Sequence, residues 1–291
     1  MAGQAQRDPA GVSDARHALL GRLIDHAALF PPASMTMPEA IEADRAARAT
    51  GEAWMLDRFI CPASRLGELP ADAPRLSVVL DGGEGDLEGV AEAIAAGRAV
   101  ELVEARIDPT WIPDTQELVR SKLGERVQAY WELPPGRGVR GEVAAVREAG
   151  AGAKIRCGGV TAEAFPPVEA VAAFVAACRD AGVRFKATAG LHHPVRHVDP
   201  STGFHMHGFL NLLAAAVFAH ADRLGEDQLA ELLAEEDPEA FAVDAGGLAV
   251  HGRHADAGAI AAARAALFAA YGSCSFFEPV EDLTALGILP V

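Results

Sequence analysis

Residues 153–190 read AKIRCGGVTAEAFPPVEAVAAFVAACRDAGVRFKATAG. The segment opens with a short apolar run at 153–157 and closes with another at 184–190. Between them, residues 166–181 have the composition and length of a helix. A strand, a helix and a second strand in this order form a βαβ unit, in which the two strands are parallel. The segment therefore predicts a parallel sheet.

The same alternation continues through the chain of 291 residues, a normal length for an α/β barrel. Further strand-like runs stand at 23–30, 54–60, 75–81, 100–107 and 126–133, and helical segments lie at 38–50, 86–97, 114–123 and 140–149. Together with the strands at 153–157 and 184–190, they predict an α/β fold of the (β/α)8, or TIM-type, barrel class. An open doubly wound sheet is the alternative, but no GxGxxG or GxxxxGK[ST] motif follows any strand.

The eighth strand is the least certain element of this prediction. A long helical stretch at 204–236 is followed by AFAVDAGGLAVHG at 240–252, which is typical of a hairpin, and then by a helix at 255–270. We place strand eight in YGSCSF at 271–276 and treat the hairpin as an insertion between strands seven and eight. The alternative puts strand eight at 240–250. We expect a disordered tail at 1–12 and one barrel domain over 13–291.

Charge and cysteine content limit the partners and the compartment. The chain has 41 Asp and Glu against 25 Lys and Arg, so its net charge of −16 argues against nucleic acid and against an anionic membrane surface. The four cysteines form no CxxC pair, which favours reduced thiols in the cytoplasm. The N-terminal residues have no apolar signal-peptide core, and no run approaches the ~18 apolar residues of a membrane span. Oligomeric state stays open, a homo-oligomer included.

Polar side chains occupy the carboxyl ends of five successive predicted strands, where barrel enzymes place their chemistry. Residues two apart share a face of a strand. The residues concerned are Asp81, Glu104 with Arg106, Tyr130 with Glu132, Lys154 with Arg156, and Lys186 with Thr188.

This group predicts a site for a small anionic substrate, such as a carboxylate or phosphate. Charged residues are rarely buried without partners, and the basic side chains would create a local positive field. The competing interpretation is that these are solvent-facing strand ends, or ion pairs that stabilise the barrel. Lys154 and Lys186 on adjacent strands disfavour each other's protonation, and a neutral lysine attacks carbonyl groups. Glu132 or Asp81 would be the general base, and Arg106, Arg156, Glu104 and Tyr130 would bind substrate.

The segments AKIRCGG and FKATAGLHH resemble the two lysine-bearing strands of deoxyribose-phosphate aldolase and related class I aldolases. The resemblance implies that Lys154 forms the Schiff base and that Lys186 lowers the pKa of Lys154. YGSCSF is similar to the phosphate-binding turn after strand eight of that family, which implies that Ser273 and Ser275 bind phosphate. LFPPA at 29–33 and GSCSFFEP at 272–279 also resemble segments of an uncharacterised bacterial family, which implies no activity.

Histidines crowd the segment HHPVRHVDPSTGFHMH at 192–207, which should lie over the barrel mouth. Imidazole is the commonest metal ligand, so His192, His193, His205 and His207, with Asp199, are candidates to bind a divalent metal such as zinc. The alternative is a polar lid. Asp25 and His26 in the first strand are weaker site candidates. Cys61, Cys157 and Cys274 fall at strand ends, where we expect small residues that pack the rim.

The favoured function is a lyase of class I aldolase type that acts on a small anionic carbonyl compound. One alternative is a metal-dependent hydrolase or lyase that uses the His192–His207 cluster. The other is a non-enzymatic barrel that binds a small molecule.

Overall fold

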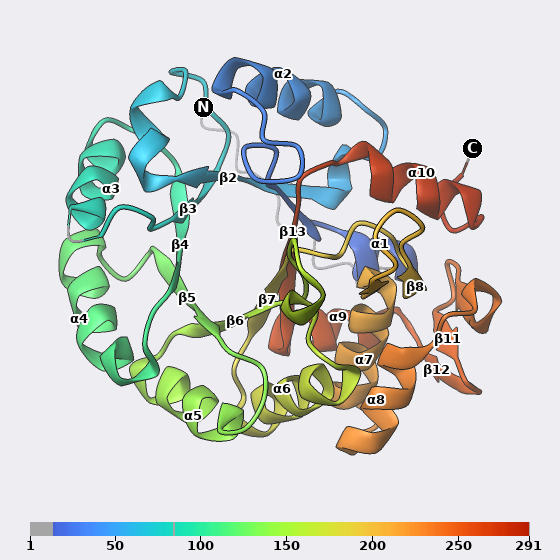
Figure 1. Cartoon of the computed structure of the whole chain (residues 1–291). Helices are drawn as coiled ribbons and strands as arrows, with labels where there is room; N and C mark the ends of the chain where they lie inside the picture. The colour runs from blue at the N-terminus through green and yellow to red at the C-terminus, as the bar shows by residue number, and fades with distance from the viewer. Residues whose placement is uncertain (1–13, 84, 291) are drawn as a thin grey trace, which may run out of the picture.

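The computed structural model describes residues 14–83 and 85–290. At its centre, eight parallel strands close into a barrel in the order β1-β13-β7-β6-β5-β4-β3-β2 (Figure 1). The predicted (β/α)8 barrel is therefore confirmed. The barrel strands are β1 (Ile24–His26), β2 (Leu56–Pro62), β3 (Leu76–Val79), β4 (Val100–Arg106), β5 (Gln128–Leu133), β6 (Gly152–Arg156), β7 (Phe185–Thr188) and β13 (Phe268–Ser273).

Helices surround the barrel and connect its strands (Figure 1). The α-helices are α1 (Ala15–Leu20), α2 (Met37–Arg48), α3 (Asp86–Ala95), α4 (Ile112–Leu123), α5 (Val139–Ala149), α6 (Val168–Ala181), α7 (Phe209–Ala221), α8 (Glu226–Ala234), α9 (Ala257–Ala266) and α10 (Phe277–Ala285). Short 3₁₀ turns are η1 (Ala53–Met55), η2 (Ala63–Glu68), η3 (Pro109–Trp111), η4 (Ala162–Ala164) and η5 (Pro238–Ala240).

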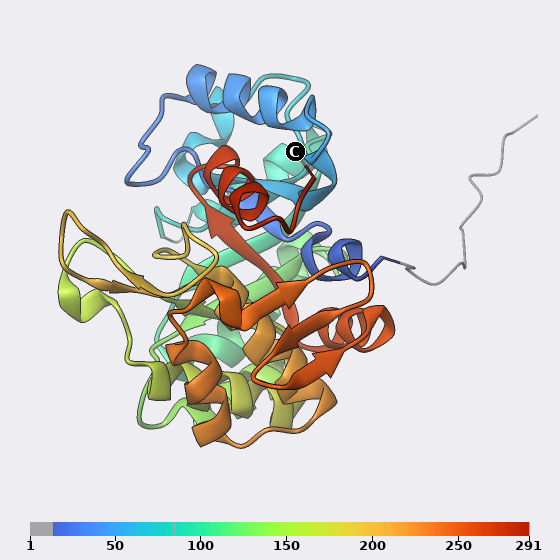
Figure 2. The same cartoon turned by 90° about the vertical axis from the view of Figure 1, so that its right-hand side faces the viewer.

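The eighth barrel strand is β13, as the sequence predicts, and it begins three residues before the predicted run. The predicted hairpin at 240–252 is the antiparallel pair β10 (Phe241–Val243) and β11 (Leu248–Val250). A third strand that the sequence analysis missed, β12 (Arg253–Ala255), extends it to a separate three-stranded sheet. Figure 2 shows this sheet in orange outside the barrel, so the hairpin is an insertion and not strand eight.

Two predictions in this part of the chain need correction. The helical stretch expected at 204–236 is two helices, α7 and α8, separated by a break near Gly225. The segment over the barrel mouth contains a small antiparallel pair, β8 (His197–Val198) and β9 (His205–Met206). These strands are two residues each, too short to leave an alternating pattern in the sequence.

The predictions of a disordered tail, a single domain and a cytoplasmic location are not tested by the structure. The tail expected at 1–12 lies outside the described residues, and the single-domain assignment stays a prediction. Within residues 14–83 and 85–290, no helix combines the length and apolar character needed to cross a bilayer.

Aromatic packing on the outer face of the barrel fixes which side chains point inward. The ring of Phe185 in β7 lies 5.3 Å from that of Phe174 in α6. The indole of Trp131 in β5 donates a hydrogen bond of 3.1 Å to Gln116 in α4. Since successive side chains of a strand point to opposite faces, the neighbours of these aromatic residues face the barrel interior. Lys186 and Glu132 are among them.

The loops after β6 and β7 touch through two glycines. A Cβ at Gly158 would lie 2.7 Å from the Gly190 Cα and 2.7 Å from the Phe165 ring. Gly190 has a φ of +65°, which side chains of L-residues rarely adopt. The two glycines therefore allow the lysine-bearing strands to enter loops that lie in contact.

Replacing Gly158 with Ala should lower the free energy of unfolding by about 1–3 kcal/mol, because the added methyl group overpacks this contact. Urea unfolding followed by circular dichroism measures the effect. Gly51→Ala is the control, because a Cβ there meets nothing within 4 Å. An unfolding midpoint for Gly158→Ala equal to that of the control would contradict the close contact of the loops.

Candidate functional site

A group of charged side chains is buried inside the barrel, and we call it the lysine cluster. It contains two basic residues and three acidic ones, contributed by β1, β4, β5, β6 and β7. Each residue is at most 7 % exposed to solvent. The members are Asp25, Glu104, Glu132, Lys154 and Lys186.

Glu104 lies at the centre of the lysine cluster. Its Oε1 accepts hydrogen bonds from Lys186 Nζ and Ser77 Oγ, and its Oε2 lies 2.8 Å from Lys154 Nζ. Burial disfavours the ionised form of Glu104, but the charges of the two lysines outweigh this effect and hold its pKa well below the usual value. One carboxylate thus pairs with two ammonium groups from adjacent strands.

Lys186 is enclosed by acidic groups. Its Nζ donates to Asp25 Oδ2 at 2.5 Å and to Glu104, and it lies 5.9 Å from the centre of the Tyr130 ring. Burial alone would lower the pKa of Lys186, but Asp25 and Glu104 outweigh burial and raise it above the usual value. Lys186 is therefore a permanent cation at neutral pH, which explains how a lysine occupies the middle of an apolar strand.

Lys154 connects the cluster to the barrel mouth. Besides Glu104, its Nζ has Glu132 Oε2 as a partner at 3.4 Å. The other oxygen of Glu132 accepts a hydrogen bond of 3.1 Å from Arg156 Nε. The Arg156 side chain is 48 % exposed, so this chain of charges runs from the closed interior to solvent.

The structure gathers several of the sequence-predicted site residues but separates others. Glu104, Glu132, Lys154 and Lys186 form the cluster, Tyr130 packs beside it, and Arg156 joins through Glu132. Arg106 ends β4 opposite Glu132 and is exposed. Asp81 lies beyond the end of β3, where it accepts hydrogen bonds from the backbone and hydroxyl of Ser64 at 3.0 and 2.7 Å. This exposed position removes Asp81 as a candidate base beside Lys154.

Two members of the interior network have little signal in the sequence. Asp25, a weaker candidate, stands in a strand of three residues, which is too short to show alternation. Ser77 lies in a short apolar strand and is fully buried. The closure of the barrel brings Asp25 to Lys186, and the pairing of β3 with β4 brings Ser77 to Glu104.

The serines predicted to bind phosphate take part in the turn between β13 and α10. Ser273 Oγ donates to the carbonyl of Ser275 at 2.6 Å, and Ser275 Oγ accepts from the Glu278 amide at 3.2 Å. The hydroxyl hydrogen of Ser273 is thus used within the turn. Their phosphate role stays a prediction.

The histidines predicted as ligands of one metal ion are not assembled. His192 and His193 point through Nδ1 to acidic residues of α10, at 3.0 Å from Glu278 and 2.6 Å from Asp282. His205 is exposed and lies 3.3 Å from Glu236.

Asp199 and His207 are also used elsewhere. Asp199 accepts hydrogen bonds from Ser201 and Thr202 in a turn, and His207 Nε2 lies 2.7 Å from the Pro166 carbonyl. In the part of the chain that the structure describes, no three His, Cys, Asp or Glu side chains are grouped so that they could hold a metal ion. The predicted metal site is not formed because each of these histidines, although close in sequence, contacts a different group.

Comparison of the chain with protein-family models and with curated protein sequences gives no match.

Lys186→Met should lower the free energy of unfolding by about 3–5 kcal/mol, because it leaves the buried Asp25 carboxylate without its main partner. The double variant Lys186→Met with Asp25→Asn should recover part of this loss, since no unpaired charge then remains. Urea unfolding of the three proteins measures both effects. A single variant as stable as the wild type would contradict the ion pairs described for Lys186.

His207 should add a pH dependence to stability. Its imidazole is 2 % exposed, and burial lowers its pKa from 6.5 to about 4, despite the hydrogen bond to Pro166. As the pH falls, the unfolded chain takes up this proton before the folded protein does. The contribution is therefore present above pH 6.5 and is lost toward pH 4, by up to roughly 3 kcal/mol.

The measurement compares unfolding free energies of the wild type and His207→Asn from pH 7 to pH 4. Asn keeps a donor for the Pro166 carbonyl but does not titrate, while all other groups titrate alike in both proteins. The wild-type curve should fall more steeply, and parallel curves would show that His207 does not remain neutral.

Proposed function

We propose that the protein is a lyase of class I aldolase type, in which Lys154 forms a Schiff base with a small anionic carbonyl compound. The observation that supports this most directly is the shared carboxylate: Glu104 pairs with Lys154 and Lys186, which stand in register on adjacent strands. The TIM-type barrel is compatible with such chemistry, and the resemblance of the two lysine segments to class I aldolases agrees with it.

The rarity of lysine in this chain also supports a chemical role for Lys154 and Lys186. Only three of the chain's 25 basic residues are lysines, and two of these are Lys154 and Lys186. Arginine is used almost everywhere else. Because a guanidinium does not deprotonate in proteins whereas an amine does, lysine in the barrel interior favours a role in proton transfer or nucleophilic attack.

Different surroundings give the two lysines different roles. Lys186 is held by two carboxylates and stays charged, so it supplies a fixed positive field beside Lys154. Lys154 is the lysine linked to the mouth through Glu132 and Arg156, and it is the nucleophile in this proposal.

In this proposal Glu132, which contacts both Lys154 and Arg156, transfers the protons. It takes a proton from the Lys154 ammonium, and the neutral amine then attacks the carbonyl carbon of the substrate. The carbinolamine takes back a proton on its hydroxyl and loses water, which leaves an iminium. When a base removes the proton of the β-hydroxyl, the C–C bond breaks and its electron pair moves to the iminium, giving an aldehyde and an enamine.

The mouth favours an anionic substrate. Arg156 is half exposed beyond Glu132, and the exposed Arg106 stands opposite Glu132 on β4. Guanidinium groups bind carboxylates and phosphates through paired hydrogen bonds. Two of them at one rim oppose the net charge of the whole chain, which is −16.

Borohydride trapping tests this proposal. A panel of small keto acids and aldehydes is added singly with borohydride, and the reduced adduct is located by peptide mass spectrometry. We expect a stable adduct on Lys154, because reduction converts the iminium to a secondary amine. Lys122 on α4 is the internal control, since it pairs with Glu88 outside the barrel.

Lys154→Met should abolish trapping, whereas Lys122→Met should leave it unchanged. An adduct on Lys122 equal to that on Lys154 would indicate unspecific reaction. Absence of any Lys154 adduct across the panel would count against Schiff-base chemistry and favour a cluster that only stabilises the barrel.

A further inference from the structure

A hollow of about 340 Å³ lies beside the turn between β13 and α10. Its wall includes His26 at the end of β1, His192 after β7, Cys274 after β13, and the aromatic residues Phe276 and Phe277. Met35 and Glu278 also line it. The hollow belongs to the carboxyl ends of the strands but contains no member of the lysine cluster.

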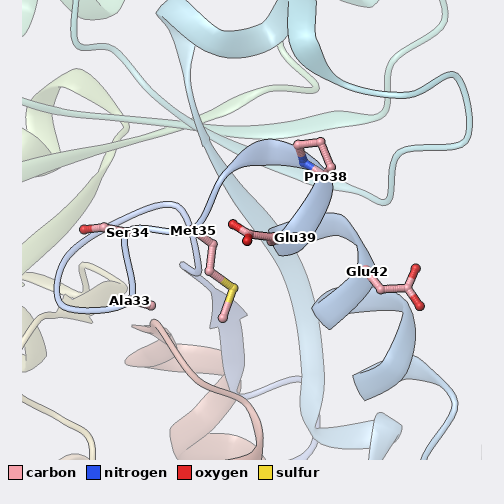
Figure 3. A pocket seen from close by; sticks show the side chains of 6 residues that line it. All are labelled: Ala33, Ser34, Met35, Pro38, Glu39 and Glu42. Carbon is pink, nitrogen blue, oxygen red and sulfur yellow. The ribbon is translucent and has the colours of Figure 1, made fainter.

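A shallower depression adjoins it along the loop before α2 and is shown in Figure 3. The carboxylate of Glu39 in this depression accepts hydrogen bonds from the Thr36 backbone and hydroxyl at 2.9 and 2.7 Å, so it caps α2. Met35 and Ala33 line both spaces. The cysteine and the two histidines named above line the hollow and not the depression.

Cys274 and His192 form a close pair in the hollow. Cys274 Sγ lies 3.8 Å from His192 Nδ1, and the same nitrogen lies 3.0 Å from Glu278 Oε2. The hydrogen bond to Cys274, with the contribution of Glu278, raises the pKa of His192 to about 9 against the effect of burial. An imidazolium at this position puts a cation and a proton donor next to the Cys274 sulfur.

The other three cysteines have a different environment. Burial raises the pKa of Cys61 and of Cys157 to about 12, and that of Cys178 well above its usual value. Cys61 and Cys157 fit the rim packing role expected from the sequence, and Cys178 is buried in α6. The sequence predicts the same packing role for Cys274. Cys274 differs from them by its cationic partner and by its place in a hollow.

A second imidazole faces the same space. His26 Nδ1 lies 3.2 Å from Asp44 Oδ1, and Asp44 is in turn held by Arg48 Nε at 2.7 Å. The ring of His26 is thus fixed by α2 while it lines the hollow. The titratable groups that line the hollow with Cys274 are therefore His192 from the loop after β7, Glu278 from α10, and His26 from β1.

We propose that this hollow is a second reactive site, in which Cys274 Sγ adds to the carbonyl carbon of a small aldehyde. The S–C bond forms, the π electron pair moves to the carbonyl oxygen, and that oxygen takes the proton from His192 Nδ1. The product is a thiohemiacetal. No oxidant and no leaving group are required, and the reverse reaction releases the aldehyde.

The size and the lining of the hollow favour a small organic ligand over a peroxide. Its volume exceeds what a peroxide needs, and Met35, Phe276 and Phe277 give it an apolar wall. The single proton that the addition requires is held by His192, next to the sulfur.

Alkylation by iodoacetamide at pH 7 tests the reactivity of the thiol in the full chain. Peptide mass spectrometry should find Cys274 modified at least about tenfold faster than Cys61, Cys157 and Cys178. His192→Gln should slow the reaction of Cys274 about tenfold, because it removes the cation. His193→Gln is the matched control, since His193 pairs with Asp282 and should leave the rate unchanged.

Propanal tests the ligand class. It should protect Cys274 from iodoacetamide in a saturable manner, whereas propan-1-ol should not. The protection should persist in Lys154→Met, so this result is separable from the Schiff-base proposal. Equal rates for all four cysteines, or equal effects of propanal and propan-1-ol, would overturn the assignment.

Discussion

The barrel interior depends on the ion pairs that the Glu104 carboxylate forms with Lys154 and Lys186. These two lysines from neighbouring strands share the carboxylate, and each also contacts a further acid, Asp25 or Glu132. Removing ions from water is costly, so such a group persists only where charges balance and hydrogen bonds are made. The acidic members compensate the two lysines, and Arg156 extends the balance toward solvent. The interior therefore holds charge without holding a large net charge.

The two lysines differ in how completely their surroundings enclose them. A fully closed network would be expected for a brace, and Lys186 fits that description, with 1 % of its surface exposed. Lys154 departs from it, because its second carboxylate lies at 3.4 Å and is shared with a half-exposed arginine. Two lysines in the same register therefore have different surroundings: Lys186 is closed in by two carboxylates, and Lys154 is connected through Glu132 to a half-exposed arginine.

The sequence predicts the fold well because its signal is local and repeated. Each βαβ unit, such as 153–190, contains its own alternation of apolar strand and amphipathic helix. Lys154, Lys186, Glu104 and Glu132 could be proposed because strand alternation places them on inward faces at known ends. Asp25 and Ser77 could not be ranked with them, since their strands are short and their partners lie many residues away. The histidine loop shows the opposite case, in which closeness along the chain did not bring side chains together around one point.

The order of strands around the barrel has a consequence for synthesis. The first strand, β1, is joined to β7 only through β13, which is made from residues 268–273 near the end of the chain. Until that segment has left the ribosome, the sheet has two open edges, and the ion pair between Asp25 and Lys186 has no closed wall around it. A nascent chain that already contains both residues thus keeps their charges hydrated. The wall around this ion pair can close only after residues 268–273 have joined β1 to β7.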